Sequence, residues 1–209
     1  MIGLVGRIEP DNMIRAQSQY GEDAQTLAYF GERRGRFLDI GAYDGHTFSN
    51  TGQFAECGWS GVCVEPSPSV FPYLVKYHKG RDVICINAAI TLRGTWTPFW
   101  DANGDALSSV VASHVEKFAP SHPFHKSWIH GVTWKQLLDG FPGPYDFLNI
   151  DVEGLNAELA LACPLNAIGA ELVCLEDDLG AQRNAVLVRF QSFGYRAPQS
   201  IGGNLLFTK

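Results

Sequence analysis

The amino-acid sequence predicts an α/β fold: a Rossmann-like, mainly parallel sheet with a terminal antiparallel strand pair. From residue 36 onward, apolar runs of strand length alternate with segments of helical periodicity. Such alternation is typical of a parallel sheet with helices on both faces. The first apolar run, residues 36–40, also leads directly into the glycine loop Gly41-Ala42-Tyr43-Asp44-Gly45, as parallel strands do where they pass into a helix.

Local signals define the elements in chain order. Ala24, Leu27 and Ala28 have helical spacing, and Ser67-Pro68 begins a later helix because Ser is a good N-cap and Pro suits the first turn. Helices are expected up to Phe30 and over residues 47–57, 67–79, 133–138, 155–163 and 181–193. Strands are expected over residues 36–40, 60–65, 82–89, 95–100, 145–150 and 171–175, with the antiparallel pair at 195–197 and 204–208.

Residues 105–131 break this alternation and are expected to be irregular. They contain four of the six histidines. A connection of this length in a compact domain is usually functional or mobile. We therefore predict an N-terminal arm and helix over residues 1–35, followed by one domain over residues 36–209 with a substrate-covering insertion at about 91–131.

The composition excludes several classes of protein. With 209 residues and 45% hydrophobic residues, the chain has the size and apolar content of one globular domain. Its net charge of −6 and the absence of a basic stripe argue against nucleic-acid binding and favour a small or neutral substrate. No apolar run approaches the about 20 residues that span a bilayer, and residues 1–10 lack the pattern of a signal peptide. We expect no membrane association.

The cysteines indicate the compartment. There are five, and no two form a Cys-x-x-Cys pair, so a zinc site is not expected. Three of them lie inside apolar, strand-like runs, where a cysteine is a small buried hydrophobic residue. This pattern indicates a reducing compartment, and we predict a cytoplasmic protein.

The glycine loop predicts a nucleoside-containing cofactor. The run 61–64 ends in Glu65, about 20 residues after the loop, where a carboxylate is well placed to hold the hydroxyls of a ribose. A dinucleotide loop has a middle glycine that is missing here, and Asp39 and Asp44 would repel a pyrophosphate. The same carboxylates suit S-adenosylmethionine, which carries a sulfonium, an ammonium group and a ribose but no phosphate. The alternative is an ordinary strand–turn–helix whose glycines only make the turn.

Carboxylates also follow the ends of the other expected parallel strands, so they should open onto one edge of the sheet. The acids are Asp39, Glu65, Asp151 with Glu153, and Glu176 with Asp177 and Asp178. The alternative is that each is a helix N-cap.

Methyl transfer to a hydroxyl needs a positioned acceptor and a base or a metal that takes its proton. We expect Asp151 and Glu153 to be catalytic. Of the histidines at 114, 122, 125 and 130, at most one should act, and His114 is the candidate. A divalent metal held by Asp151, Asp177 and Asp178 is chemically possible but not expected.

Several blocks of sequence resemble the FkbM-type family of S-adenosylmethionine-dependent methyltransferases. They are Ser18-Gln19-Tyr20-Gly21-Glu22-Asp23, the strand and loop over residues 37–45 with Ser49-Asn50-Thr51, Gly58-Trp59-Ser60-Gly61-Val62-Cys63-Val64-Glu65-Pro66, and Asp146-Phe147-Leu148-Asn149-Ile150-Asp151-Val152-Glu153-Gly154. Ser108-Ser109 and the closing Asn204-Leu205-Leu206-Phe207 also resemble family features. The resemblance implies a class I methyltransferase fold, and O-methylation of a sugar or natural product with S-adenosylhomocysteine as the second product. One departure is Asn149, where family members often have lysine.

The resemblance also implies site residues. Asp39, Gly41, Gly45 and Glu65 match cofactor-loop positions, and Asp151 with Glu153 matches the family's D-V-E-G block. The full predicted cofactor-binding set is Gln19, Asp39, Gly41, Asp44, Gly45, Glu65 and Asn87.

Two other functions remain open. A nucleotide-dependent oxidoreductase would need a glycine-rich pyrophosphate loop or a Tyr-x-x-x-Lys pair, and Tyr73-Leu74-Val75-Lys76 is one residue too short. A non-catalytic binding or assembly domain could use the same scaffold, since a fold does not determine a function.

Overall fold

The computed structural model describes residues 17–209, so most of the predicted N-terminal arm lies outside the described residues. The strands are β1 (Arg36–Ile40), β2 (Ser60–Val64), β3 (Val83–Ile86), β4 (Ala89–Ile90), β5 (Trp96–Asp101), β6 (His125–Val132), β7 (Phe147–Ile150), β8 (Leu172–Glu176), β9 (Gln199–Ile201) and β10 (Asn204–Thr208). The helices are α1 (Glu22–Phe30), α2 (Gly52–Glu56), α3 (Phe71–Tyr77), α4 (Ala112–Phe118), α5 (Trp134–Gly140), α6 (Asn156–Ala162), α7 (Leu165–Ile168) and α8 (Arg183–Ser192), with a 3₁₀ turn η1 at Gly180–Gln182.

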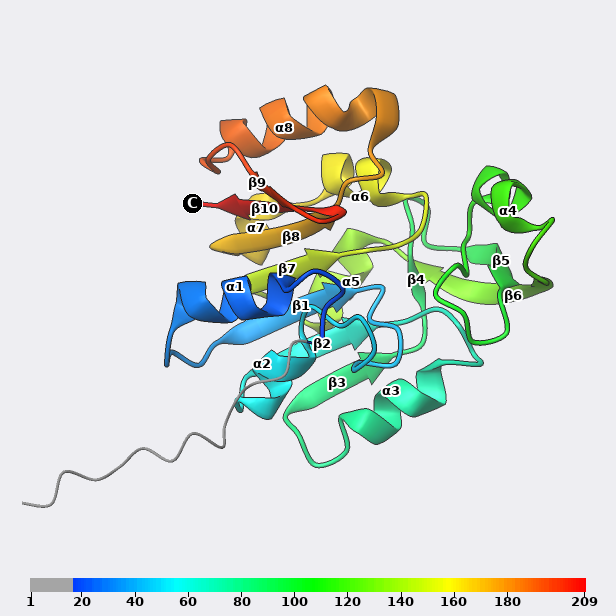
Figure 1. Cartoon of the computed structure of the whole chain (residues 1–209), viewed down its shortest axis with the longest axis horizontal. Helices are drawn as coiled ribbons and strands as arrows, with labels where there is room; N and C mark the ends of the chain where they lie inside the picture. The colour runs from blue at the N-terminus through cyan, green and yellow to red at the C-terminus, as the bar shows by residue number, and fades with distance from the viewer. Residues whose placement is uncertain (1–16) are drawn as a thin grey trace, which may run out of the picture.

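A seven-stranded sheet forms the centre of the molecule (Figure 1). Its strand order is β3-β2-β1-β7-β8-β10-β9, and the five strands from β3 to β8 are parallel. β10 pairs antiparallel with both β8 and β9. The predicted α/β fold with a mainly parallel sheet and a terminal antiparallel pair is therefore confirmed.

Helices cover both faces because successive strand residues point to opposite sides. Phe37 and Phe147 pack with Phe30 of α1 and Phe54 of α2 on one face. The alternate strand residues, with α5, α6, α7 and α8, form the larger core on the other face. Within the described residues, no helix is long and apolar enough to cross a membrane.

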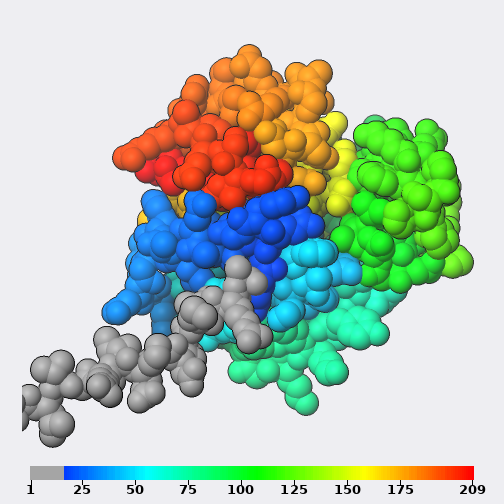
Figure 2. Space-filling model, in the orientation of Figure 1, coloured from blue at the N-terminus to red at the C-terminus, as the bar shows by residue number. Residues whose placement is uncertain are grey.

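The segment between β3 and β7 is ordered, so the prediction of an irregular stretch at 105–131 is wrong. It contains α4 and the eight-residue strand β6, which pairs antiparallel with β5 and parallel with β4 in a separate three-stranded sheet. The two histidines and the lysine of β6 are exposed, and these polar residues obscured the strand pattern in the sequence. On the buried side of β6, Ile129 packs on Phe99. Figure 2 shows this green insertion as a lobe beside the body of the molecule.

Four other predicted boundaries are wrong. The helix expected at 47–57 begins only at Gly52, because the Ser49 hydroxyl accepts the N–H groups of Thr51 and Gly52 in a turn. The helix expected from Ser67 begins at Phe71 for a similar reason, since the Ser67 hydroxyl accepts from Val70 N.

The strand expected at 82–89 ends at Ile86, after which the chain leaves the main sheet for the small one. The terminal strand expected at 195–197 lies instead at Gln199–Ile201. Tyr195 packs on Phe190, and its hydroxyl donates to the carbonyl of Ala170, so this residue belongs to the core.

Candidate active site

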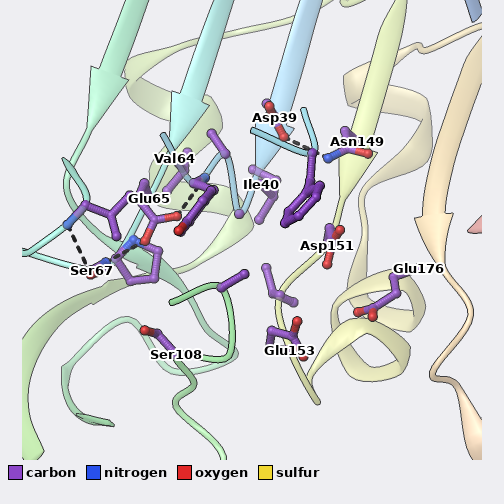
Figure 3. A pocket seen from close by; sticks show the side chains of 18 of the residues that line it. Asp39, Ile40, Val64, Glu65, Ser67, Ser108, Asn149, Asp151, Glu153 and Glu176 are labelled. Carbon is purple, nitrogen blue, oxygen red and sulfur yellow. Dashed lines mark hydrogen bonds between the residues drawn. The ribbon is translucent and has the colours of Figure 1, made fainter. Parts of the chain in front are cut away.

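A pocket runs along the carboxyl edge of the main sheet, from β2 past β1 to β7 and β8 (Figure 3). Val64, Ile40, Asp151 and Glu176 mark the ends of these four strands in its wall. The opposite wall comes from the insertion and includes Ser108. This is the edge at which open α/β sheets bind their ligands.

Acidic side chains dominate the lining of this pocket. The carboxylates are those of Glu22, Asp39, Glu65, Asp105, Asp151, Glu153 and Glu176. Among the lining residues of the described chain there is no lysine, arginine or histidine. An acidic lining without compensating cations attracts positively charged ligands and repels anions.

Glu65 follows β2 and is held by two backbone donors. Tyr43 N donates to Oε2 at 2.9 Å and Ser67 N donates to Oε1 at 2.7 Å. Burial raises the pKa of this carboxyl to about 7, although the two N–H groups oppose the shift. Each oxygen keeps a second lone pair, so the carboxylate can still accept from two hydroxyls of a ligand.

Asp39 lies at the back of the pocket, and neighbouring side chains already donate hydrogen bonds to both of its carboxylate oxygens. Thr51 Oγ1 donates to one of its oxygens at 2.5 Å and Asn149 Nδ2 donates to the other at 2.8 Å. Burial raises its pKa, and these two hydrogen bonds counter the effect. Asn50 Nδ2 donates to Asn149 Oδ1 in turn, which leaves Asn50 Oδ1 buried without a hydrogen-bond partner in residues 17–209. Asn149 therefore belongs to the network that fixes Asp39.

The glycine loop is shaped by packing within the protein. Gly41 lines the pocket, has a φ of 88°, and leaves no room for a Cβ because the carbonyl oxygen of Asp151 occupies that space. Gly45 lies outside the lining, and a Cβ there would meet Leu74 and His78 around α3. Asp44 also lies outside the lining and accepts from His46 N and Thr47 N in a tight turn. Of the loop residues predicted to bind the cofactor, the structure places Gly41 at the pocket.

The other two predicted cofactor residues differ in position. Gln19 lines the pocket next to Glu22. Asn87 does not line it, because its side-chain amide donates to the carbonyls of Glu65 and Pro66 and braces the loop after β2.

Glu22 and Asn204 also line the pocket, although neither was predicted to bind a ligand, and they come from opposite ends of the chain. Glu22 begins α1 and Asn204 begins β10, and Asn204 Nδ2 donates to Glu22 Oε1 at 2.7 Å. Both are more than nine-tenths buried and line the pocket. No local pattern signals this pairing, since it depends on β10 lying beside β8.

Asp151, Glu153 and Glu176 form a cluster at the other end of the pocket. Each offers a carboxylate oxygen, and these oxygens all lie within 4.8 Å of one another. Burial, and then the neighbouring carboxylates, raises the pKa of all three, that of Glu153 to about 8. Burial, and then the neighbouring Asp151 carboxylate, raises the pKa of Glu176, because the two like charges lie close together.

The turn that carries Glu153 is strained and firmly held. Glu153 has a φ of 38°, in a region that non-glycine residues rarely adopt. Ser109 Oγ donates to its carbonyl at 2.7 Å, and Gly154 N donates to Asp178 Oδ2 at 3.1 Å. The insertion therefore fixes the backbone on which Glu153 is presented.

The alternative that these acids are helix caps is not observed. α6 begins after Leu155 with no side-chain cap, and neither η1 nor α8 has one. Asp177 instead forms an ion pair with Arg183 at 2.9 Å, and Asp178 accepts from Asn156. The metal set considered from the sequence, which included both, is wrong, and Glu176 takes their place beside Asp151.

His114 is the histidine of the insertion that reaches this cluster. Its Nε2 lies 3.3 Å from Glu153 Oε2, and its side chain is 8% exposed. Burial, and then the charge of Lys117, lowers its pKa, which favours the neutral ring. His125 and His130 are exposed on β6, and His122 lies 3.9 Å from Asp105.

Sequence comparison assigns this chain to a known protein family. The model of the methyltransferase FkbM domain matches residues 39–160, which is more than half of the chain. The chain therefore belongs to the FkbM methyltransferase family, as its sequence blocks predicted. A comparison with curated proteins gave no significant match.

Solved structures of similar fold also include methyltransferases. The TehB-like SAM-dependent methyltransferase of Corynebacterium glutamicum has a TM-score of 0.47 and 14% identity, over 92% of this chain and 89% of that one. A hypothetical protein of Thermus thermophilus has a TM-score of 0.48 and 16% identity, over 97% and 92%. The ribosomal protein L11 methylase of Lactobacillus delbrueckii has a TM-score of 0.45 and 11% identity, over 89% and 74%. The family assignment rests on the family model.

Proposed function

We propose that this methyltransferase uses S-adenosylmethionine to methylate a hydroxyl group of a sugar or other small natural product. The observation that carries the proposal is the division of one acidic pocket into two parts. Glu65 offers paired acceptors for a ribose near β2, and the cluster of Asp151, Glu153 and Glu176 lies at the far end beyond β7. A cofactor and an acceptor can therefore lie in line along one edge of the sheet.

The residues at the β1–β2 end fit a cofactor that is a cationic nucleoside. Glu65 would accept from the ribose hydroxyls, and the orphaned Asn50 Oδ1 offers a buried acceptor to an ammonium group. Asp39 adds a buried carboxylate nearby, and Gln19 lines the same pocket. When bound, S-adenosylmethionine supplies a methyl group made electrophilic by a positively charged sulfur.

The residues at the β7–β8 end fit the proton transfer. A hydroxyl that gains a methyl group must lose its proton, and a base near the working pH does this best. The pKa of about 8 makes the Glu153 carboxylate a stronger base than an ordinary glutamate. Glu153 Oε2 takes the proton of the hydroxyl, Asp151 orients the acceptor, and the neutral Nε2 of His114 lies 3.3 Å behind Glu153.

The insertion covers the acceptor in this proposal. Phe99, Asp105 and Ser108 form the pocket wall that faces the sheet edge. Closure of a site from water favours transfer of the methyl group to the bound acceptor over hydrolysis. Substrate choice would then lie in the lobe that Figure 2 shows beside the body.

The compartment remains a proposal as well. The five cysteines are all free, and three of them are buried. Free thiols are typical of a reducing compartment, which supports a cytoplasmic enzyme.

The direct test is binding followed by transfer. Ligand binding raises the melting temperature by mass action, so S-adenosylmethionine and S-adenosylhomocysteine should each stabilise the protein and NAD should not. Transfer of labelled methyl from S-adenosylmethionine to a panel of hydroxylated sugars should then find an acceptor. Glu171→Gln, an exposed acid far from the pocket, is the control. Stabilisation by NAD alone would refute the proposal.

A further inference from the structure

We infer that Asp151, Glu153 and Glu176 form a binding site for one divalent cation of the Mg²⁺ or Mn²⁺ type. The three carboxylates come from the end of β7, the turn that follows it, and the end of β8. Their oxygens lie within 4.8 Å of one another, and Figure 3 shows the three side chains directed at the same part of the pocket. Carboxylate oxygens at such spacing are the ligands that hard divalent cations prefer.

The protein itself provides little compensation for this negative charge. Asn156 Nδ2 donates to Glu176 at 2.5 Å, and His114 Nε2 lies 3.3 Å from Glu153 Oε2. Arg183, which follows β8, is already paired with Asp177. Three carboxylates that face one another without a cation repel, and a divalent ion removes that cost.

Two buried side chains at the border of the cluster point independently to a missing ligand. His114 Nε2 has no hydrogen-bond partner, although its side chain is more than nine-tenths buried and faces Glu153 Oε2 at 3.3 Å. Asn204 lies opposite Glu176 in the β8–β10 register, so both side chains point to the same face of the sheet. Its Oδ1 is also buried without a partner in residues 17–209.

Buried polar atoms normally find a hydrogen bond, so orphans on two sides of one acidic cluster call for an explanation. A hydrated cation supplies it. The carboxylates hold the ion, and its water molecules donate to Asn204 Oδ1 and, where that nitrogen carries no proton, to His114 Nε2.

The site would act on the acceptor, and this part rests on the proposed function. A cation lowers the pKa of a hydroxyl bound to it, which leaves a better nucleophile at neutral pH. Cation binding itself does not depend on methyl transfer.

The experiment is a Mn²⁺ titration of the full chain without cofactor, with free Mn²⁺ measured by electron paramagnetic resonance. Wild type should bind one ion per chain. Glu153→Gln and Glu176→Gln should each weaken binding at least tenfold, with circular dichroism checking that they are folded. Asp177→Asn removes the same charge at the residue next to Glu176, and should bind Mn²⁺ as wild type does.

Three outcomes would overturn the inference: no Mn²⁺ binding by wild type, equal losses in Asp177→Asn, or wild-type binding in both glutamine variants. Binding of methylammonium in place of Mn²⁺ would assign the cluster to a cationic acceptor and would also overturn it. The proposed function is separable. Full methyl transfer after chelator treatment would refute the role of the cation in catalysis and leave the proposed function intact. Mn²⁺ binding without any S-adenosylmethionine binding would support the cation site and refute the proposed function.

Discussion

The two ends of the pocket differ in how many hydrogen-bond donors the protein supplies to their buried carboxylates. At the β1–β2 end, Asp39 and Glu65 each have a protein donor on both oxygens. At the β7–β8 end, Asp151, Glu153 and Glu176 face one another and have few donors. The first end is arranged before any ligand arrives, whereas the second needs a proton or a cation to neutralise it. Preorganised groups suit a constant cofactor, and a charged cluster suits proton chemistry.

The largest expected effect is a loss of chemistry at the β7–β8 end. Asp151→Asn should lower turnover by a factor of ~10²–10⁴, because the acceptor hydroxyl loses the orientation that lets Glu153 take its proton, and acid–base catalysis usually contributes about this factor. Affinity for S-adenosylmethionine should change little, because the β1–β2 end is untouched. Single-turnover kinetics with a sugar acceptor and calorimetry separate the two quantities. Full activity in the variant would show that Asp151 is only structural, and chelation that reproduces the loss in wild type would indicate the cation.

The next effect is a loss of cofactor affinity at the β1–β2 end. Glu65→Gln keeps the shape of the side chain and loses the charge, and hydrogen bonds to a charged group contribute about 1.5–3 kcal/mol each. We expect S-adenosylmethionine to bind at least tenfold more weakly by calorimetry, with circular dichroism unchanged. Glu171→Gln serves as the control. Unaltered affinity would exclude Glu65 from the ribose contact and weaken the comparison between the two ends.

A third effect is on the pH dependence of stability. The pKa of Glu65 rises from 4.5 to about 7 in the folded protein, mainly through burial. The folded state therefore binds more protons than the unfolded state between these values, and the free energy of unfolding falls as pH rises from about 5 to 8. The contribution is roughly 3 kcal/mol. Denaturant melts without cofactor should show a shallower fall in Glu65→Gln, and equal slopes would contradict the assignment.

The strand-end acids could be predicted because apolar runs locate the ends of parallel strands, and parallel strands share an edge. That reasoning placed Asp39, Glu65 and Asp151 together. It could not separate Glu176 from Asp177 and Asp178, since the choice depends on which side of β8 each one faces and on the ion pair with Arg183.

Other parts of the site depend on contacts that sequence spacing does not report. β6 was missed because its exposed face carries histidine and lysine, and it becomes a strand only through pairing with β5. Asn204 reaches the pocket through a strand that returns beside β8, far along the chain from Glu22. Asp44 and Gly45 match the cofactor-loop motif in sequence, but they do not line the pocket. Asp44 caps a tight turn, and Gly45 packs against α3.

The contact of Gly41 with the carbonyl of Asp151 has a genetic consequence. Every single-nucleotide change in a glycine codon gives either glycine, a stop, or a residue with a Cβ, and the backbone of the neighbouring strand end excludes any Cβ at this position. The positive φ adds a second penalty for each such residue. No point mutation that replaces this glycine with another residue can be neutral unless the turn at Asp151 moves as well, and that turn carries the acids. A replacement of Gly41 in the loop therefore requires a shift of the turn that carries the acidic cluster at the other end of the pocket.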